Sequence, residues 1–292
     1  MLAAATLLVR NRSVQCADDV SRASPLVVMT GSVAHQARVV RVLALTAFKL
    51  KYTDSALGYF WSLARPLALF GVLYVVFGRA LGLGTTEHYP VFLLLGVVLY
   101  TFFSDATMTT MISIVEHNSL LRKVAFERLI IPVSSSVTAL INFGLNLLAI
   151  VAFAAWEGIV PGLDWLLLIP LFLELYVFVL GVSLILATLF ARLRDVGDIW
   201  EVALRVFFYA FAIIFPLQLL PLWAQRVIVL NPFAQVMQDV RAIVLGGTQT
   251  VTVTDVLGGA LGLLAPLAIA ILLFVGGIVF FKREEHWFAE QV

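Results

Sequence analysis

Apolar residues occur in long stretches along this chain, and short polar segments separate them. A helix that crosses a bilayer needs about 20 predominantly apolar residues, so each long stretch is a candidate span. Three stretches contain no charged residue: Leu129 to Trp156, Val206 to Gln225 and Val256 to Phe281. The pattern predicts six spanning helices, at about 62–84, 90–111, 130–156, 165–190, 203–223 and 257–281.

Several of the predicted spans carry charged residues that a bilayer must accommodate. Asp105 interrupts the second span and Glu174 the fourth, and carboxylates inside a membrane are costly and often functional. Arg65 and Arg79 flank the short apolar centre of the first span. Because long arginine side chains extend toward the headgroups, we expect this span to reach across the bilayer.

A basic segment, Val33 to Tyr52, precedes the first span. Its apolar residues recur at helical spacing, and basic residues occupy other positions. This pattern predicts an amphipathic helix on the inner membrane surface, with its charges at Arg38, Arg41, Lys49 and Lys51. The alternative is an ordinary cytoplasmic helix packed on the protein.

More than thirty residues, Leu222 to Asp255, separate the fifth and sixth spans. They contain two apolar, helix-like pieces that are too short to span, Trp223 to Leu230 and Phe233 to Leu245. Broken backbone at membrane depth is tolerated only where protein buries it or where it lines a cavity. We therefore predict short re-entrant helices, with Asn231, Pro232 and Arg241 as the residues of interest.

The loop after the second span, Ile114 to Arg128, is charged but still partly apolar. Leu120, Leu121, Val124 and Ala125 share one face if the segment is helical. Such a helix could dock into a cytoplasmic partner, and a solvated turn is the alternative.

Composition supports an all-α integral membrane protein. Apolar residues make up 62% of the chain and charged residues 13%, whereas soluble domains carry about 25% charged residues. The four histidines and the single cysteine lie far apart, so no metal site is expected. None of the four lysines follows a glycine, which excludes a Walker A phosphate-binding loop. We expect no cofactor on this chain and no catalytic residue.

The basic residues lie mainly on one side of the predicted membrane. Sixteen of the nineteen Lys and Arg residues fall on the side of the N-terminal segment, and only Arg79, Arg226 and Arg241 fall on the other. Because positive charge is retained in the cytoplasm, both termini are predicted to be cytoplasmic. Residues 1–32 are largely polar after their first few positions, and we expect them to form a flexible tail.

Several blocks of sequence resemble one known family. LKYTDSALGYFWSLARPLALFGVLYVVFG (Leu50–Gly78), YPVFLLLGVVLYTFFSDA (Tyr89–Ala106) and NSLLRKVAFERLIIPVSS (Asn118–Ser135) are similar to polysaccharide-export permeases of the ABC-2 type. LRDVGDIW (Leu193–Trp200) and LNPFAQVMQDVRAIVLGG (Leu230–Gly247) follow in the same order. The resemblance implies one transmembrane domain, residues 33–292.

The resemblance also implies partners and a cargo. Such permeases are homodimers in the cytoplasmic membrane, and each copy pairs with a separate nucleotide-binding subunit that holds ATP and Mg²⁺. The complex exports a lipid-linked polysaccharide, such as O-antigen, teichoic acid, capsule or cell-wall galactan, and the arginine-rich residue usage favours the galactan. The family's coupling helix corresponds here to a segment that includes Asn118, Leu121, Arg122, Lys123, Phe126, Glu127 and Arg128.

Aromatic residues on the first and fifth spans are candidates for the lining of a channel. Phe208, Phe211 and Phe215 are three and four residues apart, so they share one helical face. Together with Tyr74 on the first span, they would offer ring surfaces along which a glycan could slide. Contact with lipid or packing in the protein core is the alternative for these rings.

Three other functions are consistent with the pattern. An ABC-2 permease for a drug or a lipid differs only in cargo. A proton-coupled secondary transporter would use Asp105 and Glu174 and would need no ATPase. A membrane scaffold would transport nothing.

Overall fold

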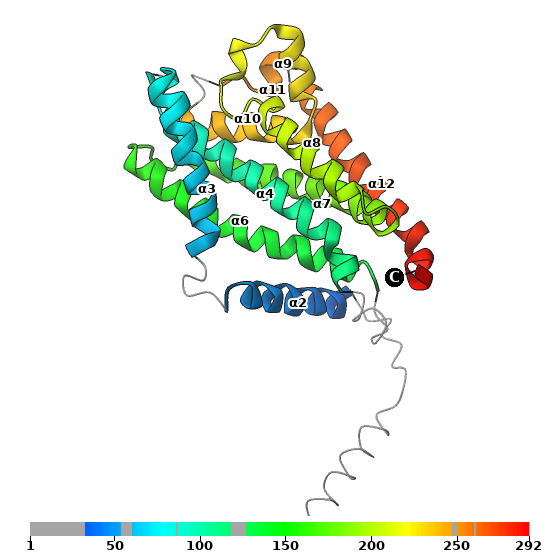
Figure 1. The fold of residues 1–292 in the computed structure, drawn as a ribbon. Helices are drawn as coiled ribbons and strands as arrows, with labels where there is room; N and C mark the ends of the chain where they lie inside the picture. Colours follow the sequence, from blue (N-terminus) through cyan, green and yellow to red (C-terminus); the bar gives the residue numbers. More distant parts are fainter. Residues whose placement is uncertain are drawn as a thin grey trace, which may run out of the picture.

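The structure, a computed structural model, describes residues 33–53, 60–85, 87–117, 127–246, 250–259 and 261–291. All regular elements in these ranges are helical, and Figure 1 shows their arrangement. The predicted tail, residues 1–32, lies outside them. The α-helices are α2 (Val33–Thr53), α3 (Phe60–Leu73), α4 (Tyr89–Glu116), α6 (Ile130–Trp156), α7 (Leu168–Arg192), α8 (Val196–Ala210), α9 (Leu222–Val229), α10 (Pro232–Leu245), α11 (Val253–Leu257) and α12 (Leu261–Gln291). The short elements are a π-helical segment, Tyr74–Ala80, and 3₁₀ turns at Leu83–Thr85, Leu163–Leu167 and Leu217–Leu219.

Five continuous helical segments are long and apolar enough to cross a membrane. They correspond to the predicted spans one, two, three, four and six, which the structure confirms. Their bounds are Phe60–Ala80, Tyr89–Glu116, Ile130–Trp156, Leu163–Arg192 and Gly262–Glu285.

The fifth predicted span, 203–223, is wrong as a continuous helix. Helix α8 ends at Ala210 and contains 15 residues, about 22 Å at 1.5 Å per residue, less than the roughly 30 Å of a hydrocarbon core. Ala212 adopts a left-handed φ of 54°, and Pro216 follows in an extended conformation. Residues 211–216 are called the α8 break below. The sixth candidate span is instead the α9–α10 pair, bent by 103°.

Helix α4 lies at the centre of the bundle. In an apolar 18-residue stretch of α4, 72% of the residues are buried, against at most 39% in the corresponding stretches of the other four spans. It packs against α6 and α7, and α7 packs against α12. A Cβ on Gly181 would come within 2.6 Å of the Phe274 backbone, so this glycine permits the close approach of α7 to α12.

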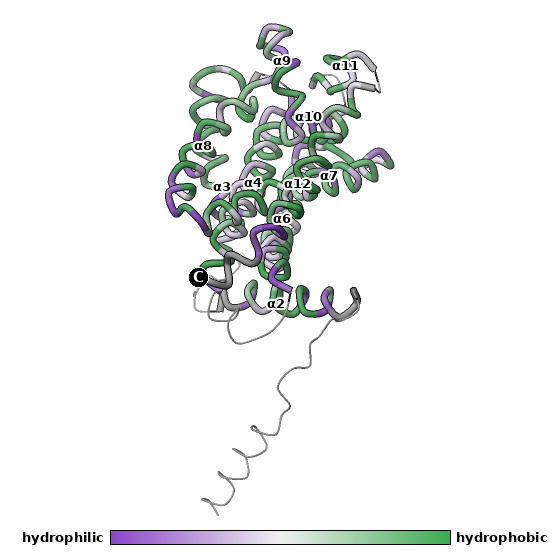
Figure 2. Tube along the Cα trace, turned by 90° about the vertical axis from the view of Figure 1, so that its right-hand side faces the viewer, coloured by the Kyte–Doolittle hydropathy of each residue, from purple (hydrophilic) through white to green (hydrophobic). Residues whose placement is uncertain are grey.

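Helix α2 lies across one end of the bundle, and the short helices α9, α10 and α11 gather at the opposite end (Figure 1). Figure 2 shows apolar and polar residues alternating along α2. Arg38, Arg41 and Lys49 are exposed, whereas Ala44 is buried and its carbonyl accepts a hydrogen bond from Thr138 of α6 at 3.3 Å. The predicted helix is therefore present, and its contact with a membrane surface stays a prediction. The side chain of Lys51 lies outside the described part.

Candidate functional site

The two short helices α9 and α10 meet at Asn231 and Pro232, where the sequence predicted a division. The Asn231 side chain accepts a hydrogen bond from the Phe233 amide at 2.9 Å and so caps α10. Pro232 occupies the first turn of α10, where a backbone N–H would have no acceptor within the helix, so its missing N–H costs no hydrogen bond. These two residues start α10 at a sharp angle to α9.

Arg241 on α10 is fully buried and bonds to the α8 break. Its Nη1 and Nη2 donate to the carbonyls of Ala212 and Ile213 at 3.1 and 2.6 Å, and its Nε donates to the Phe92 carbonyl at 3.2 Å. The guanidinium carbon also lies 3.5 Å from the centre of the Phe92 ring, a cation–π contact. The guanidinium thus ties α10 to both α4 and the break.

Tyr89 completes this arrangement. Its hydroxyl donates to the Ile214 carbonyl at 2.9 Å. Consecutive carbonyls of the break therefore receive side-chain donors in place of the helical N–H groups they have lost. The sequence singled out Arg241 only as a basic residue in a re-entrant segment, and it gave no signal for this role of Tyr89.

The aromatic residues predicted to line a channel pack mainly inside the protomer. Phe208 and Phe211 are 8% and 6% exposed, with ring centroids 4.9 Å from Tyr100 and 5.0 Å from Phe233, respectively. Phe215 is partly buried. Core packing, the alternative considered above, describes these contacts, and a channel role stays a prediction.

The remaining predicted channel residue, Tyr74, is half-buried on the π-helical segment. It stacks on Phe70 at 5.8 Å between ring centroids, and the Arg79 guanidinium lies 5.9 Å from its ring. Tyr209 of α8, which the sequence did not single out as part of the aromatic face, is 64% exposed. The exposed face of α8 is thus distinct from its buried phenylalanine face.

Only two residues of the predicted coupling segment are described. The Glu127 carboxylate accepts from the Gln36 amide of α2 at 2.7 Å and lies 3.7 Å from the Lys282 ammonium of α12. Arg128 donates to the backbone carbonyl of Glu285. Glu127 therefore connects the end of this segment to α2 and α12, and Arg128 connects it to α12. The other predicted coupling residues, Asn118, Leu121, Arg122, Lys123 and Phe126, lie outside the described residues.

The two intramembrane carboxylates line different cavities. Asp105 faces a cavity of about 310 Å³ between α2, α4 and α6. Glu174 faces one of about 630 Å³, which it shares with Asp239 of α10. The sequence could not pair Glu174 with Asp239, because their proximity arises only when α10 folds back against α7.

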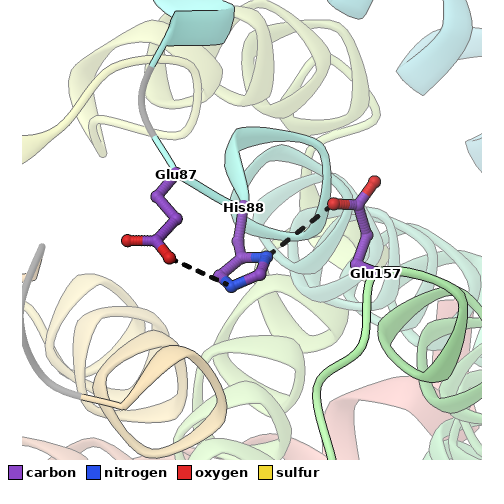
Figure 3. Close-up of polar contacts among 3 residues, drawn as sticks. All are labelled: Glu87, His88 and Glu157. Atoms are coloured by element: carbon purple, nitrogen blue, oxygen red, sulfur yellow. Dashed lines mark ion pairs between the residues drawn. The ribbon is translucent and has the colours of Figure 1, made fainter.

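A cluster of three polar residues connects the start of α4 to the end of α6. His88, with a left-handed φ of 53°, lies between Glu87 and Glu157, with nitrogen–oxygen distances of 3.8 and 3.7 Å (Figure 3). Within the described ranges, no three His, Cys, Asp or Glu side chains have an arrangement that could hold a metal ion.

Comparison with known proteins matches this architecture to one family. The profile of the family described as "ABC-2 type transporter" matches residues 38–245, well over half of the chain. Two relatives from Klebsiella pneumoniae, each named O-antigen export system permease protein RfbA, are 28% and 25% identical over 83% of this chain and 90% of their own length. A Myxococcus xanthus protein of the same name is 26% identical over 84% of this chain and 91% of its own. The chain belongs to the ABC-2 type transporter family.

Proposed function

We propose that this protein is the membrane permease subunit of an ATP-driven exporter that moves a lipid-linked polysaccharide across the cytoplasmic membrane. The observation that carries the proposal is the similarity, over more than four-fifths of the chain, to three relatives named for O-antigen export. Five continuous apolar helices and the bent α9–α10 pair are consistent with a subunit of this kind.

The energy for export comes from a separate nucleotide-binding subunit, which binds ATP and Mg²⁺. No lysine of this chain follows a glycine, so the chain lacks a Walker A loop of its own. The partner docks on the cytoplasmic segment 118–128. Since Glu127 and Arg128 at its end contact α2 and α12, a displacement of the segment would be transmitted to these two helices.

Two copies of the chain form the transport path. The most apolar windows of the α3 and α12 spans are each only 17% buried, so these spans are available to lipid or to a second copy. Val72 and Val75 on the first span and Val206 on α8 are among the exposed apolar residues.

The excess of basic residues on one side of the membrane supports cytoplasmic termini. Cell-wall galactan is the cargo we favour.

Depletion of the protein in its native cell tests this function. The expected result is that a lipid-linked glycan accumulates on the cytoplasmic side, where mass spectrometry of the extracted lipid identifies both glycan and carrier. An inactive variant of the partner ATPase should cause the same glycan to accumulate. Export that continues without the ATPase, driven by a proton gradient, would contradict the proposal.

A further inference from the structure

A cavity that bears two carboxylates lies beside the bent pair, at the end of the bundle opposite α2. Its volume of about 630 Å³ falls within the range of roughly 300–1,000 Å³ that is usual for small-molecule sites. Helices α7, α10 and α12 form its walls, with residues next to and within α11 contributing to one edge. Most of its lining is aliphatic, including Leu167, Leu171, Leu263, Leu267 and Ile271.

Two carboxylates face this apolar space. Asp239 is held in place because its oxygens accept from the Gln235 amide at 2.6 Å and from the Val253 backbone N–H at 3.4 Å. Glu174 differs, since its Oε1 is buried and has no hydrogen-bond partner among the residues that the structure describes. A buried carboxylate oxygen without a donor is unfavourable, so this oxygen is suited to accept from a bound ligand.

The lining restricts the chemistry of that donor. Among the described residues that line the cavity there is no Lys, Arg or His, so neither carboxylate is neutralised from within it. An anionic headgroup, such as the phosphate of a lipid carrier, would be repelled by two carboxylates in a space of low dielectric. A bare metal ion would find two carboxylates but too few further ligands, and it would leave the aliphatic walls unused.

We propose that this cavity binds a membrane phospholipid with a primary ammonium headgroup. The ammonium offers three N–H donors and a positive charge, which suit Glu174 and Asp239 together. The hydrocarbon chain lies along the leucine and isoleucine walls and continues over the exposed side chains of Leu173 and Ile271. The site depends on the chain's location in a membrane and not on which cargo it exports.

Native mass spectrometry of the full-length protein released from nanodiscs tests the proposal. The probes are phosphatidylethanolamine and phosphatidylcholine with identical acyl chains, because methylation removes every N–H donor and keeps the charge. We expect at least about tenfold greater retention of phosphatidylethanolamine, the size expected for one charge-assisted hydrogen bond. Equal retention of the two lipids would overturn the proposal.

Variants locate the binding to this cavity. Glu174→Gln with Asp239→Asn should abolish the preference for phosphatidylethanolamine, whereas Asp105→Asn, at a carboxylate in a different cavity, should leave it unchanged. Ile271→Trp places a bulkier side chain on the cavity wall without altering either carboxylate and should lower phosphatidylethanolamine retention. A preference that survives both the double variant and Ile271→Trp would place the lipid elsewhere and refute the assignment.

Discussion

A Cβ added to Gly96 of α4 would overlap Nη2 of Arg241, the fully buried guanidinium of α10. The same Cβ would lie 3.2 Å from the Ile213 carbonyl that Nη2 bonds. The absence of a side chain at position 96 is therefore what lets the arginine reach the α8 break. This close approach links the central helix, the bent pair and the break through a single residue.

Gly96→Ala should destabilise the protein by about 1–3 kcal/mol, because the added methyl group displaces Arg241 or the break. The measurement is the melting temperature of the detergent-purified protein. Gly144→Ala is a matched control in α6, since a Cβ there meets no atom within 4 Å. Equal melting temperatures for the two variants would show that Arg241 has room to move.

Arg241→Lys should be nearly as damaging as Arg241→Ala. A lysine keeps the charge but lacks the planar fork that reaches the carbonyls of Ala212 and Ile213 together. Leaving those buried carbonyls unpaired costs about 1–3 kcal/mol each. Thermal unfolding and the amount of protein in the membrane report the effect. Arg226→Ala on α9, whose side chain is exposed, is the control and should behave as wild type.

Glu127→Ala should reduce export by the reconstituted complex severalfold while basal ATP hydrolysis by the partner persists. The change removes the contacts to Gln36 and Lys282, and because these groups are partly exposed the loss of stability should stay near 1 kcal/mol or below. Export and ATP hydrolysis are measured together in proteoliposomes. Glu201→Ala breaks the exposed pair with Arg205 on α8 and is the control. Unaltered coupling in Glu127→Ala would remove this residue from force transmission.

Phe208→Ala should lower stability and Tyr209→Ala should affect export, because these two neighbouring residues differ in burial. Phe208 packs edge-on against Tyr100 in the core, so its truncation should cost about 3–5 kcal/mol of stability. Tyr209 is exposed, and its truncation should leave the melting temperature unchanged but slow export if the exposed face of α8 borders the transport path. Wild-type export by Tyr209→Ala would exclude that face from the path.

The sequence predicted five of the six spans because long charge-free stretches leave few alternatives to a helix in a bilayer. It failed at the fifth because apolar composition does not report where a helix breaks. The sequence contains Pro216, which disfavours a helix. The left-handed turn at Ala212, however, is stabilised by a hydrogen bond from Arg241 of α10 to the Ala212 carbonyl, and no local sequence pattern reveals that contact. Composition identifies which residues meet the membrane and leaves open which backbone groups lack partners.

The candidate site was predictable to a similar extent. Asn231 and Pro232 mark the start of α10 because their roles are local. Glu174 was evident as a carboxylate inside a span, but its neighbour Asp239 comes from α10, and Gln36 and Glu127 lie 91 residues apart. Contacts of this kind depend on how the helices pack, so sequence periodicity alone could not supply them.

The α8 break also has a consequence for biogenesis. The Ile213 carbonyl is paired by a residue 28 positions further along the chain, so a nascent chain that ends before α10 exposes unpaired backbone at this depth. Release of α8 alone into lipid is therefore unfavourable. We therefore expect residues 196–245 to enter the bilayer together, after Arg241 has been synthesised.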